Sequence, residues 1–475
     1  MEDNNIPIFK VSITGSTAPI IGQGSFGKVY ALDKQNVYKK IRVLAETEND
    51  FAIIENNVRE LAFYRLIMGK NTFTNSFILE NMPSSIPIPN KIVYIHPYVC
   101  INMPNYGIPL SKLTYNKTTF KHIFKQIIEA IYHLYRNNMS HGDLKPNNIL
   151  IDSNNNVKLI DYGSVCFFHS KYIKNEYQRC TIFYVSPEEL ISGKYSKEND
   201  WWSLGVIMFE FCTHKCFIKS LLDYYNMNKS DTNKFMDYGY DARDDFDSKE
   251  FIITFFQNLE NANINRFITT VVKDKEIQLY LILLLKIRPD ERNFLEIIKL
   301  FECDIREIKL IKVVSGLTKF EDYDILSLSK KSRFNAITTI CTTSYQVKEF
   351  GEEIIGHSIM LFDRFFMRSI ESADIYDPKI YTVISLFISS SILKGELFKG
   401  SYIQGILRLI YNKEYSIEDI KQYLISFFQV LDFSFFCMSP DILFNFTRSY
   451  DRLIELSVEY PFINDNIYQL YKLLK

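Results

Sequence analysis

The sequence predicts an α+β domain followed by an all-α domain, and three observations support this prediction. Residues 18–103 hold short apolar runs separated by polar turns, as β-strands do. Residues 104–305 add longer segments in which apolar residues recur at helical spacing. Residues 333–431 show helical spacing only. The polar residues 1–17 lack periodicity and are predicted to form a short arm.

Length and composition limit the function classes. The 475 residues suffice for two or three domains of roughly 150 residues each. The 55 Lys and Arg nearly cancel the 56 Asp and Glu, so the charge indicates neither a nucleic-acid partner nor a membrane surface. No apolar run is long enough to span a bilayer, and there is no signal-peptide pattern. We therefore expect an intracellular protein, cytoplasmic or nuclear.

The eight cysteines are scattered, which suits a reducing compartment. Cys212, His214 and Cys216 form the one cluster of metal-ligand residue types. Zinc needs four ligands, and no second pair lies nearby in the sequence. Ordinary packing is therefore favoured over a metal site.

The first motif is a glycine-rich segment at residues 21–29. A strand pattern, Lys28–Leu32, follows the glycines instead of a helix. This favours a hairpin over nucleotide phosphates, where backbone N–H groups can approach the anion. The alternatives are a Rossmann turn and a glycine-rich turn without a ligand. The candidate residues are Ile21, Gly22, Gln23, Gly24, Ser25, Phe26, Gly27, Lys28 and Val29.

The next strand and helix supply a candidate ion pair. In the strand Val37–Ile41, alternation places Lys39 on the inward face and Lys40 on the outward face, with Lys40 as the alternative by a one-residue slip. Residues 53–68 have helical spacing. Glu60 on this helix would face the strands and pair with Lys39.

The chemical centre is a predicted hairpin formed by two apolar runs, Asn148–Asp152 and Val157–Asp161. The hairpin brings Asp143, Asn148 and Asp161 to one edge. Oxygen ligands from Asn148 and Asp161 suit Mg²⁺, and Asp143 can accept the proton of an attacking hydroxyl. The predicted chemistry is phosphoryl transfer from a magnesium nucleotide.

These motifs resemble those of eukaryotic-type protein kinases, in the same order. His-Gly142-Asp resembles the catalytic loop, with glycine where most kinases have arginine. Asp-Tyr162-Gly resembles the metal-binding motif, with tyrosine for phenylalanine. Lys145 gives the Asp-Leu-Lys-Pro form, which resembles serine/threonine kinases.

The resemblance implies a bilobal fold, with a small lobe over 18–103 and a large lobe over 104–305, and ATP and Mg²⁺ as cofactors. It implies that Lys39 contacts the α- and β-phosphates and that Lys145 neutralises charge on the transferred phosphoryl group. It also implies that the strand Tyr98–Met103 leads into a hinge that binds adenine through its backbone. The hinge candidates are Asn102 and Met103, and the structural candidates are Glu188, Asp200 and Arg292.

The resemblance also bears on regulation and substrate. Without an arginine at Gly142, the kinase is predicted not to need a phosphorylated activation segment; Glu176 could supply part of the charge, with a solvent-facing glutamate as the alternative. Kinases that require proline after the phosphosite usually carry arginine where Val185 stands, which argues against such a requirement. The acidic segment Asp237–Glu250 is interpreted as a solvated insert, with a docking surface for basic substrate segments as the alternative.

Beyond a linker at 306–332, residues 333–475 are predicted to form a helical domain. Part of it resembles cyclins: Ser358–Phe366 resembles their Leu-Asp-Arg-Phe helix, and Leu386–Ser391 their buried third helix. Three positions depart from the family. The tryptophan expected after Arg333 in the first helix is missing. The lysine expected in the third helix falls at Ser391 unless a shift recruits Lys394, and the glutamate expected in the fifth falls near Leu424. A second cyclin box would be truncated. The expected helices span 333–348, 350–370, 378–394, 401–411 and 417–431.

The prediction is therefore a serine/threonine kinase that phosphorylates proteins and has an intramolecular cyclin-like partner. We expect this partner to lie against the 53–68 helix and hold Glu60; docking on the large lobe is the competing arrangement. The alternatives are a kinase of another subfamily with an unrelated helical docking domain, and a pseudokinase scaffold. A composition rich in Ile, Asn and Lys indicates an AT-rich genome and is compatible with a large DNA virus acting in its host cell.

Overall fold

The structure is a computed structural model in which the chain is described from residue 19 to residue 431, with gaps. The described residues are 19–24, 27–42, 51–68, 82–95, 98–137, 139–167, 173–174, 182–225, 246–304, 335–336, 339–340, 343, 352–368, 377–393 and 400–431.

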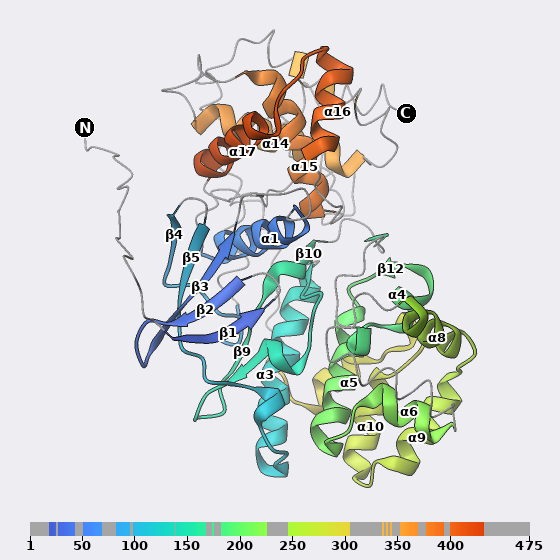
Figure 1. Cartoon of the computed structure of the whole chain (residues 1–475). Coiled ribbons are helices and arrows are strands. Elements are labelled where there is room, and N and C mark those ends of the chain that lie inside the picture. The colour runs from blue at the N-terminus through green and yellow to red at the C-terminus, as the bar shows by residue number, and fades with distance from the viewer. Residues whose placement is uncertain are drawn as a thin grey trace, which may run out of the picture.

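A five-stranded antiparallel sheet in the order β1-β2-β3-β5-β4 forms the small lobe (Figure 1). The predicted strands are present, with ends shifted by at most one residue. In β3, Lys39 pairs with Val29 of β2 and Ile101 of β5, which places this lysine in the middle of the sheet. The strands are β1 (Ile20–Gly24), β2 (Gly27–Ala31), β3 (Asn36–Arg42), β4 (Lys91–Ile95) and β5 (Tyr98–Pro104).

Helix α1 (Phe51–Ile67) corresponds to the helix predicted over 53–68. Its side chains at Val58, Leu61 and Ala62 are buried, as their spacing predicts. The helix contacts both β3 and the short 3-10 helix η4 (Tyr162–Ser164) in the large lobe. It therefore joins the two lobes next to the predicted metal-binding motif.

The large lobe begins with an amphipathic helix and the predicted hairpin. Helix α3 (Lys117–Arg136) begins at Lys117 because Asn116 caps it, accepting a hydrogen bond from the Thr118 N–H at 2.9 Å. Strands β8 (Ile149–Ile151) and β9 (Val157–Leu159) form the hairpin and are shorter than predicted. The other strands of the large lobe are β6 (Ile108–Pro109), β7 (Met139–Ser140), β10 (Cys166–Phe167), β11 (Ile173–Lys174) and β12 (Lys194–Tyr195).

The rest of the large lobe is helical and packs around α5 (Asn199–Thr213). Trp201 and Trp202 at its start are fully buried. The hydrophobic content of this helix on all sides suits its central position. The other helices are α4 (Pro187–Ser192), α6 (Phe217–Tyr224), α8 (Phe246–Gln257), α9 (Asn261–Val271), α10 (Lys275–Leu284) and α11 (Phe294–Leu300), with short 3-10 turns η2 (Leu110–Lys112), η3 (Pro146–Asn148), η5 (Ile182–Tyr184) and η7 (Pro289–Glu291).

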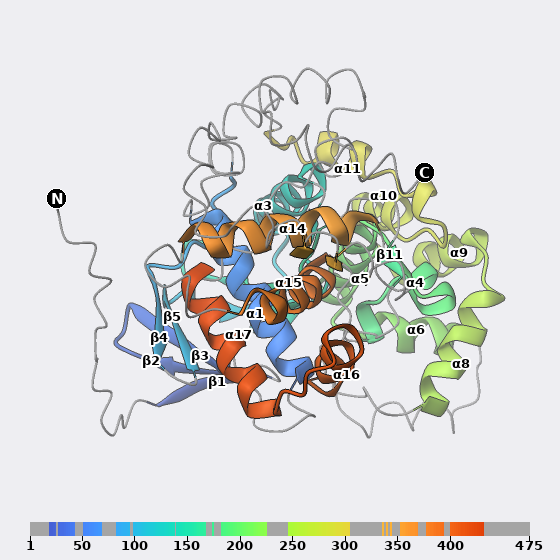
Figure 2. The same ribbon diagram turned by 90° about the horizontal axis from the view of Figure 1, so that it is seen from above.

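In the part of residues 333–475 that the structure describes, four helices with printed bounds belong to a C-terminal helical module: α14 (Glu352–Arg368), α15 (Pro378–Leu393), α16 (Gly400–Tyr411) and α17 (Ile417–Leu431). Their ends lie within two residues of the predicted ends. Helix α15 contacts the other three, and also α1 and β10. Figures 1 and 2 show the module on the α1 side of the small lobe, away from α8 to α10. The arrangement is the expected one on α1, with an added contact to β10 after the metal-binding motif.

Several predictions fall outside the described residues. These are the arm at 1–17, Ser25 and Phe26, Glu176, residues 237–245 of the acidic segment, the linker, most of the 333–348 helix and everything after residue 431.

The cluster of Cys212, His214 and Cys216 lies where two helices meet. Cys212 lies in the last turn of α5, His214 is its C-cap, and Cys216 is the N-cap of α6. Burial raises the pKa of the Cys212 thiol to about 12 and that of Cys216 to about 11. Among the described helices, none is long and apolar enough to cross a membrane.

Candidate active site

A cavity of about 1210 Å³ lies where the small-lobe sheet meets the large lobe. Lys39 and Glu60 line it from the small lobe, and Asp143, Asn148 and Asp161 from the large lobe. The structure thus brings the predicted chemical residues to one cavity, although they are spread over the sequence from β3 to η4.

Three charged side chains meet at the back of this cavity. The Lys39 Nζ donates to Glu60 Oε1 and Oε2 at 2.8 and 2.7 Å, and to Asp161 Oδ1 at 2.9 Å. Lys40 instead lies with its Nζ 4.0 Å from the centre of the Tyr98 ring. The alternation of β3 therefore directs Lys39 to the carboxylates, as the sequence predicts.

The electrostatics of this cluster favour the ion pairs. Burial lowers the pKa of Lys39, but the Asp161 and Glu60 carboxylates outweigh it and raise this pKa above its ordinary value. Burial raises the pKa of Asp161, but Lys39 outweighs it and holds this pKa below its ordinary value. Burial raises the pKa of Glu60 against the opposing effect of Lys39. Lys39 is thus a cation at neutral pH.

The catalytic-loop residues form a second cluster at the cavity. Lys145 Nζ donates to Asp143 Oδ2 at 2.7 Å. Asn148 Nδ2 donates to the same oxygen at 3.2 Å and to the Asp143 backbone oxygen at 2.8 Å. Two donors therefore fix the orientation of the Asp143 carboxylate.

Asp200 fixes the backbone of this loop through two hydrogen bonds. Its carboxylate accepts hydrogen bonds from the His141 N–H at 2.6 Å and the Gly142 N–H at 3.2 Å. Gly142 has φ of 84°, and a Cβ there would lie 2.1 Å from the Ser164 backbone oxygen. Both the conformation and the close approach require glycine, so the departure from the kinase pattern has a local physical reason.

Aromatic stacking connects α1 to the metal-binding motif. The Tyr162 ring stacks on Phe63 of α1 at 4.0 Å between centroids and meets Tyr64 edge-on at 6.0 Å. The His141 ring lies 4.9 Å from Tyr162. Asp161 has φ of 69°, an uncommon backbone conformation for a residue with a side chain, and such conformations concentrate at functional sites.

One end of the cavity combines residues of the glycine-rich segment with a residue predicted for the hinge. Met103 lies in the cavity wall, whereas Asn102 does not; the Asn102 backbone oxygen accepts from the Asn90 N–H at 2.9 Å. Gly24 and Lys28, although in β1 and β2, also lie outside the wall. The sequence-predicted residues that line the cavity here are Ile21, Gly22, Gln23, Gly27, Val29 and Met103.

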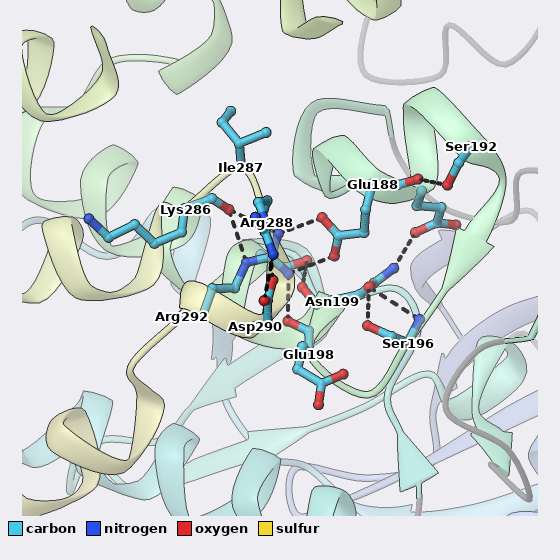
Figure 3. Close-up of polar contacts among 12 residues, drawn as sticks. Glu188, Ser192, Ser196, Glu198, Asn199, Lys286, Ile287, Arg288, Asp290 and Arg292 are labelled. Atoms are coloured by element: carbon cyan, nitrogen blue, oxygen red, sulfur yellow. Dashed lines mark hydrogen bonds and ion pairs between the residues drawn. The ribbon is translucent and has the colours of Figure 1, made fainter. Parts of the chain in front are cut away.

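Glu188 and Arg292, predicted as structural residues, form a bidentate ion pair (Figure 3). The Arg292 guanidinium donates to Glu188 Oε1 and Oε2 at 2.6 and 2.5 Å. It also donates to the backbone oxygens of Glu198 at 3.1 Å and Lys286 at 3.2 Å. The pair joins α4 to the loop before α11.

Sequence reasoning missed two groups of residues. The apolar cavity walls include Val37, Leu150 and Ile160, and strand alternation relative to Lys39 could have identified Val37. Arg59 was overlooked as a contact residue: it is fully buried and bonds to backbone oxygens of Gly163 and Ser391. No local pattern indicates these long-range partners.

A family model described as "Protein kinase domain" matches residues 16–293. The chain belongs to the protein kinase family. The predicted kinase domain is thereby confirmed, with its sheet-rich small lobe and helical large lobe. Helices α14 to α17 lie beyond the matched residues.

Curated relatives match about two fifths of the chain. One is a probable serine/threonine-protein kinase of Dictyostelium discoideum, 28% identical over 40% of this chain and 45% of its own length. An SNF1-related protein kinase catalytic subunit of Arabidopsis thaliana is 32% identical over 40% of this chain and 37% of its own. A cell division control protein 2 homolog of Trypanosoma brucei brucei is 28% identical over 42% and 63%. In each case the match spans less than two thirds of the relative. The first of these names supports the serine/threonine class.

Proposed function

We propose that this protein is a serine/threonine kinase that transfers the γ-phosphoryl group of ATP to protein hydroxyls. The observation that carries the proposal is the closed contact of Lys39 with Glu60 and Asp161 at 2.7 to 2.9 Å. A formed lysine–glutamate pair beside a metal-binding aspartate is what kinase catalysis requires. Asp143 faces the same cavity.

The residues present suit Mg²⁺. The Asn148 side-chain nitrogen donates hydrogen bonds to Asp143, so the side-chain oxygen of Asn148 remains as a ligand atom. Asp161 contributes carboxylate oxygens, and its lowered pKa keeps it ionised at neutral pH. Hard oxygen donors of this kind are the ligands that Mg²⁺ prefers. Asn148 and Asp161 would hold the ion, which supplies charge neutralisation at the phosphates.

The chain's own residues then orient the reaction. Asp143, fixed by Lys145 and Asn148, accepts the hydrogen bond of the substrate hydroxyl and takes its proton as the oxygen attacks the γ-phosphorus, while the bond from this phosphorus to the β–γ bridging oxygen breaks and ADP leaves. Lys145 offsets negative charge on the transferred group, and Lys39 holds the α- and β-phosphates. The glycine-rich hairpin β1–β2 covers the phosphates.

We further propose that the helical module regulates the kinase in cis as a cyclin-like domain. Two facts support this: α15 packs on the helix that carries Glu60, and it is the central helix of its module. The helix bearing this glutamate is a movable element in kinases, so a partner resting on it can bias the Lys39–Glu60 pair. Covalent linkage raises the effective concentration of such a partner to the millimolar range for a short linker. An unrelated module that only docks is the alternative.

A phosphotransfer assay with radiolabelled ATP and a peptide array tests the kinase proposal. We expect incorporation on serine or threonine by the full chain and its loss in Asp143→Asn. Asp223→Asn, an exposed change on α6, is the matched control and should retain activity. Incorporation that persists in Asp143→Asn would show that the activity belongs to a contaminant or that the assignment is wrong. Absence of activity in the full chain would favour a pseudokinase scaffold.

Removal of residues 325–475 tests regulation by the module. If the truncated kinase folds and binds ATP but turns over about 5- to 150-fold more slowly, and the separate module restores the rate, the cis-activator proposal stands. A folded truncated kinase with the full rate would leave the module as a docking domain only.

Two expectations complete the proposal. Gly142 has no side chain that could bind a phosphate on the activation segment, so phosphatase-treated protein should retain its activity. A large loss of activity would overturn this expectation.

We also propose an intracellular location, cytoplasmic or nuclear, in keeping with the composition, and a large DNA virus as the source. Expression of a tagged chain in cells, followed by microscopy, tests the location.

A further inference from the structure

Helices α1 and α15 come from different domains, and Arg59 bridges them. Arg59 directly precedes Glu60 on α1 and is 0% exposed. Its NH2 group donates to the Ser391 backbone oxygen at 2.8 Å, and its NH1 group donates to the Gly163 backbone oxygen at 3.0 Å. One guanidinium therefore contacts the helical module and the metal-binding motif together.

The contact with Ser391 satisfies the end of a helix. Ser391 lies in the last turn of α15, where carbonyl groups lack an intrahelical N–H partner. The C-terminal end of a helix also carries partial negative charge, which favours a cation. A guanidinium at this point therefore stabilises α15 only while α15 remains docked on α1.

The contact with Gly163 fixes the loop that carries Asp161. Gly163 lies two residues after Asp161, and a Cβ on this glycine would lie 3.3 Å from the Asn56 backbone oxygen. The motif thus packs closely against α1 next to Arg59. A change in the position of the Arg59 guanidinium would alter this packing and, with it, the position of the Asp161 carboxylate.

We propose that Arg59 is a positioning residue through which docking of the helical module sets both Glu60 and Asp161. Glu60 follows Arg59 on the same helix, and Asp161 lies two residues before the carbonyl that Arg59 holds. Both carboxylates bind Lys39, so the contact of Arg59 with α15 influences the positions of all three charged side chains. This inference rests on the proposed kinase function and specifies how the module would act on it.

The planar guanidinium explains why arginine occupies this position. Its separate N–H groups can reach two carbonyls in different directions, whereas a lysine ammonium is a point charge on a flexible chain. Arg59→Lys keeps the charge but loses the planar arrangement of the N–H groups. Arg59→Met keeps the apolar stem and loses the hydrogen bonds to Gly163 and Ser391, together with the one to the Asn56 side chain at 3.3 Å. The two variants separate charge from geometry.

The test compares full-length wild type, Arg59→Met and Arg59→Lys by turnover, Mg·ATP binding by calorimetry and hydrogen exchange. We expect Arg59→Met to lower kcat about 5- to 150-fold and to weaken Mg·ATP binding. Backbone exchange should rise together at 161–165 and 388–393 and stay unchanged in α5. The kcat, Mg·ATP affinity and exchange rates of Arg59→Lys should lie between those of wild type and those of Arg59→Met. Arg288→Met, whose arginine side chain is 68% exposed in the large lobe, is the matched control and should match wild type.

Unchanged kcat in a folded Arg59→Met, with faster exchange confined to 388–393, would overturn the proposal and leave Arg59 as a docking contact. If Arg59→Met does not fold, Arg59→Lys decides, and wild-type turnover and exchange in that variant would overturn the proposal. If the wild type itself transfers no phosphate, the kinase proposal fails. Mg·ATP binding and the two exchange sites then still decide whether Arg59 couples the module to Asp161.

Discussion

Aromatic rings pack in the cores of both the kinase domain and the described part of the helical module, but the charged contacts that line the cavity lie in the kinase domain. In the kinase domain, buried charges meet specific partners, as in Lys39–Glu60 and Arg292–Glu188. In the described part of the module, aromatic rings form the centre: Phe365 stacks on Tyr381 at 4.1 Å and on Phe427 at 5.3 Å. The first kind of contact requires particular residues, whereas the second requires only apolar volume of a suitable shape.

The largest expected effect concerns the charges at the cavity. Asp143→Asn and Asp161→Asn should each reduce turnover by about 10²- to 10⁴-fold, because one removes the base and the other a ligand of a hard cation. Only Asp161→Asn should also weaken Mg·ATP binding. Steady-state kinetics and calorimetry measure both quantities. Equal Mg·ATP affinity in the two variants would contradict the division of roles.

The buried ion pair of the large lobe should be the next most sensitive site. Arg292→Met leaves the Glu188 carboxylate, whose side chain is 11% exposed, without its buried partner and should reduce the free energy of unfolding by about 3–5 kcal/mol. Arg288→Met is the matched control four residues earlier (Figure 3). The Arg288 side chain is 68% exposed and its ion pair with Asp290 should contribute at most about 1 kcal/mol. Urea denaturation compares the two, and similar losses would contradict the distinction.

The helical module should tolerate a change of shape better than a loss of volume. Phe365 is fully buried, so Phe365→Ala should cost about 3–5 kcal/mol through the cavity it leaves. Phe365→Leu should cost about 1.5 kcal/mol or slightly more, since much of the volume is kept. Leu409→Ala, at an 81% exposed side chain on α16, is the control with little expected effect. Equal costs for Ala and Leu at position 365 would contradict a core set by volume.

This contrast explains what the sequence could predict. Glu60, Asp143 and Arg292 were assigned because each position in a kinase allows one chemistry, so residue type and order are informative. In the module, helical spacing predicted the ends of α15 and α17 within one residue. The same spacing cannot identify a cyclin, because many apolar sequences satisfy it. Arg59 escaped prediction because its carbonyl partners in Gly163 and Ser391 are backbone groups that any residue supplies.

A smaller effect is expected at Gly142, where the kinase domain departs from its family. Gly142→Ala places a methyl group against the Ser164 backbone oxygen at a positive φ, and we expect a loss of about 1–3 kcal/mol. Turnover should also fall, because Asp200 holds the Gly142 N–H and with it the loop before Asp143. Gly405→Ala in α16 is the control, since a Cβ there meets nothing within 4 Å. Thermal unfolding would contradict the expectation if Gly142→Ala were as stable as wild type.

The smallest effect on stability should come from the buried imidazole of His133, which, among the described residues, faces no carboxylate that would favour its protonated form. Burial, with a smaller contribution from Arg136, lowers the pKa of His133 on α3 to about 4. Between this value and the ordinary pKa near 6.5, the unfolded chain binds a proton that the folded chain does not, so stability should fall as pH falls through this range. The loss should be about 1–2 kcal/mol at pH 5 relative to pH 7.5. Urea denaturation should show a weaker pH dependence in His133→Gln, whereas His122→Gln, at an exposed position on the same helix, should keep the wild-type slope. If His133→Gln retained the full slope, the acid sensitivity would belong to other groups, and the paired carboxylates of the cavity would be the first to test.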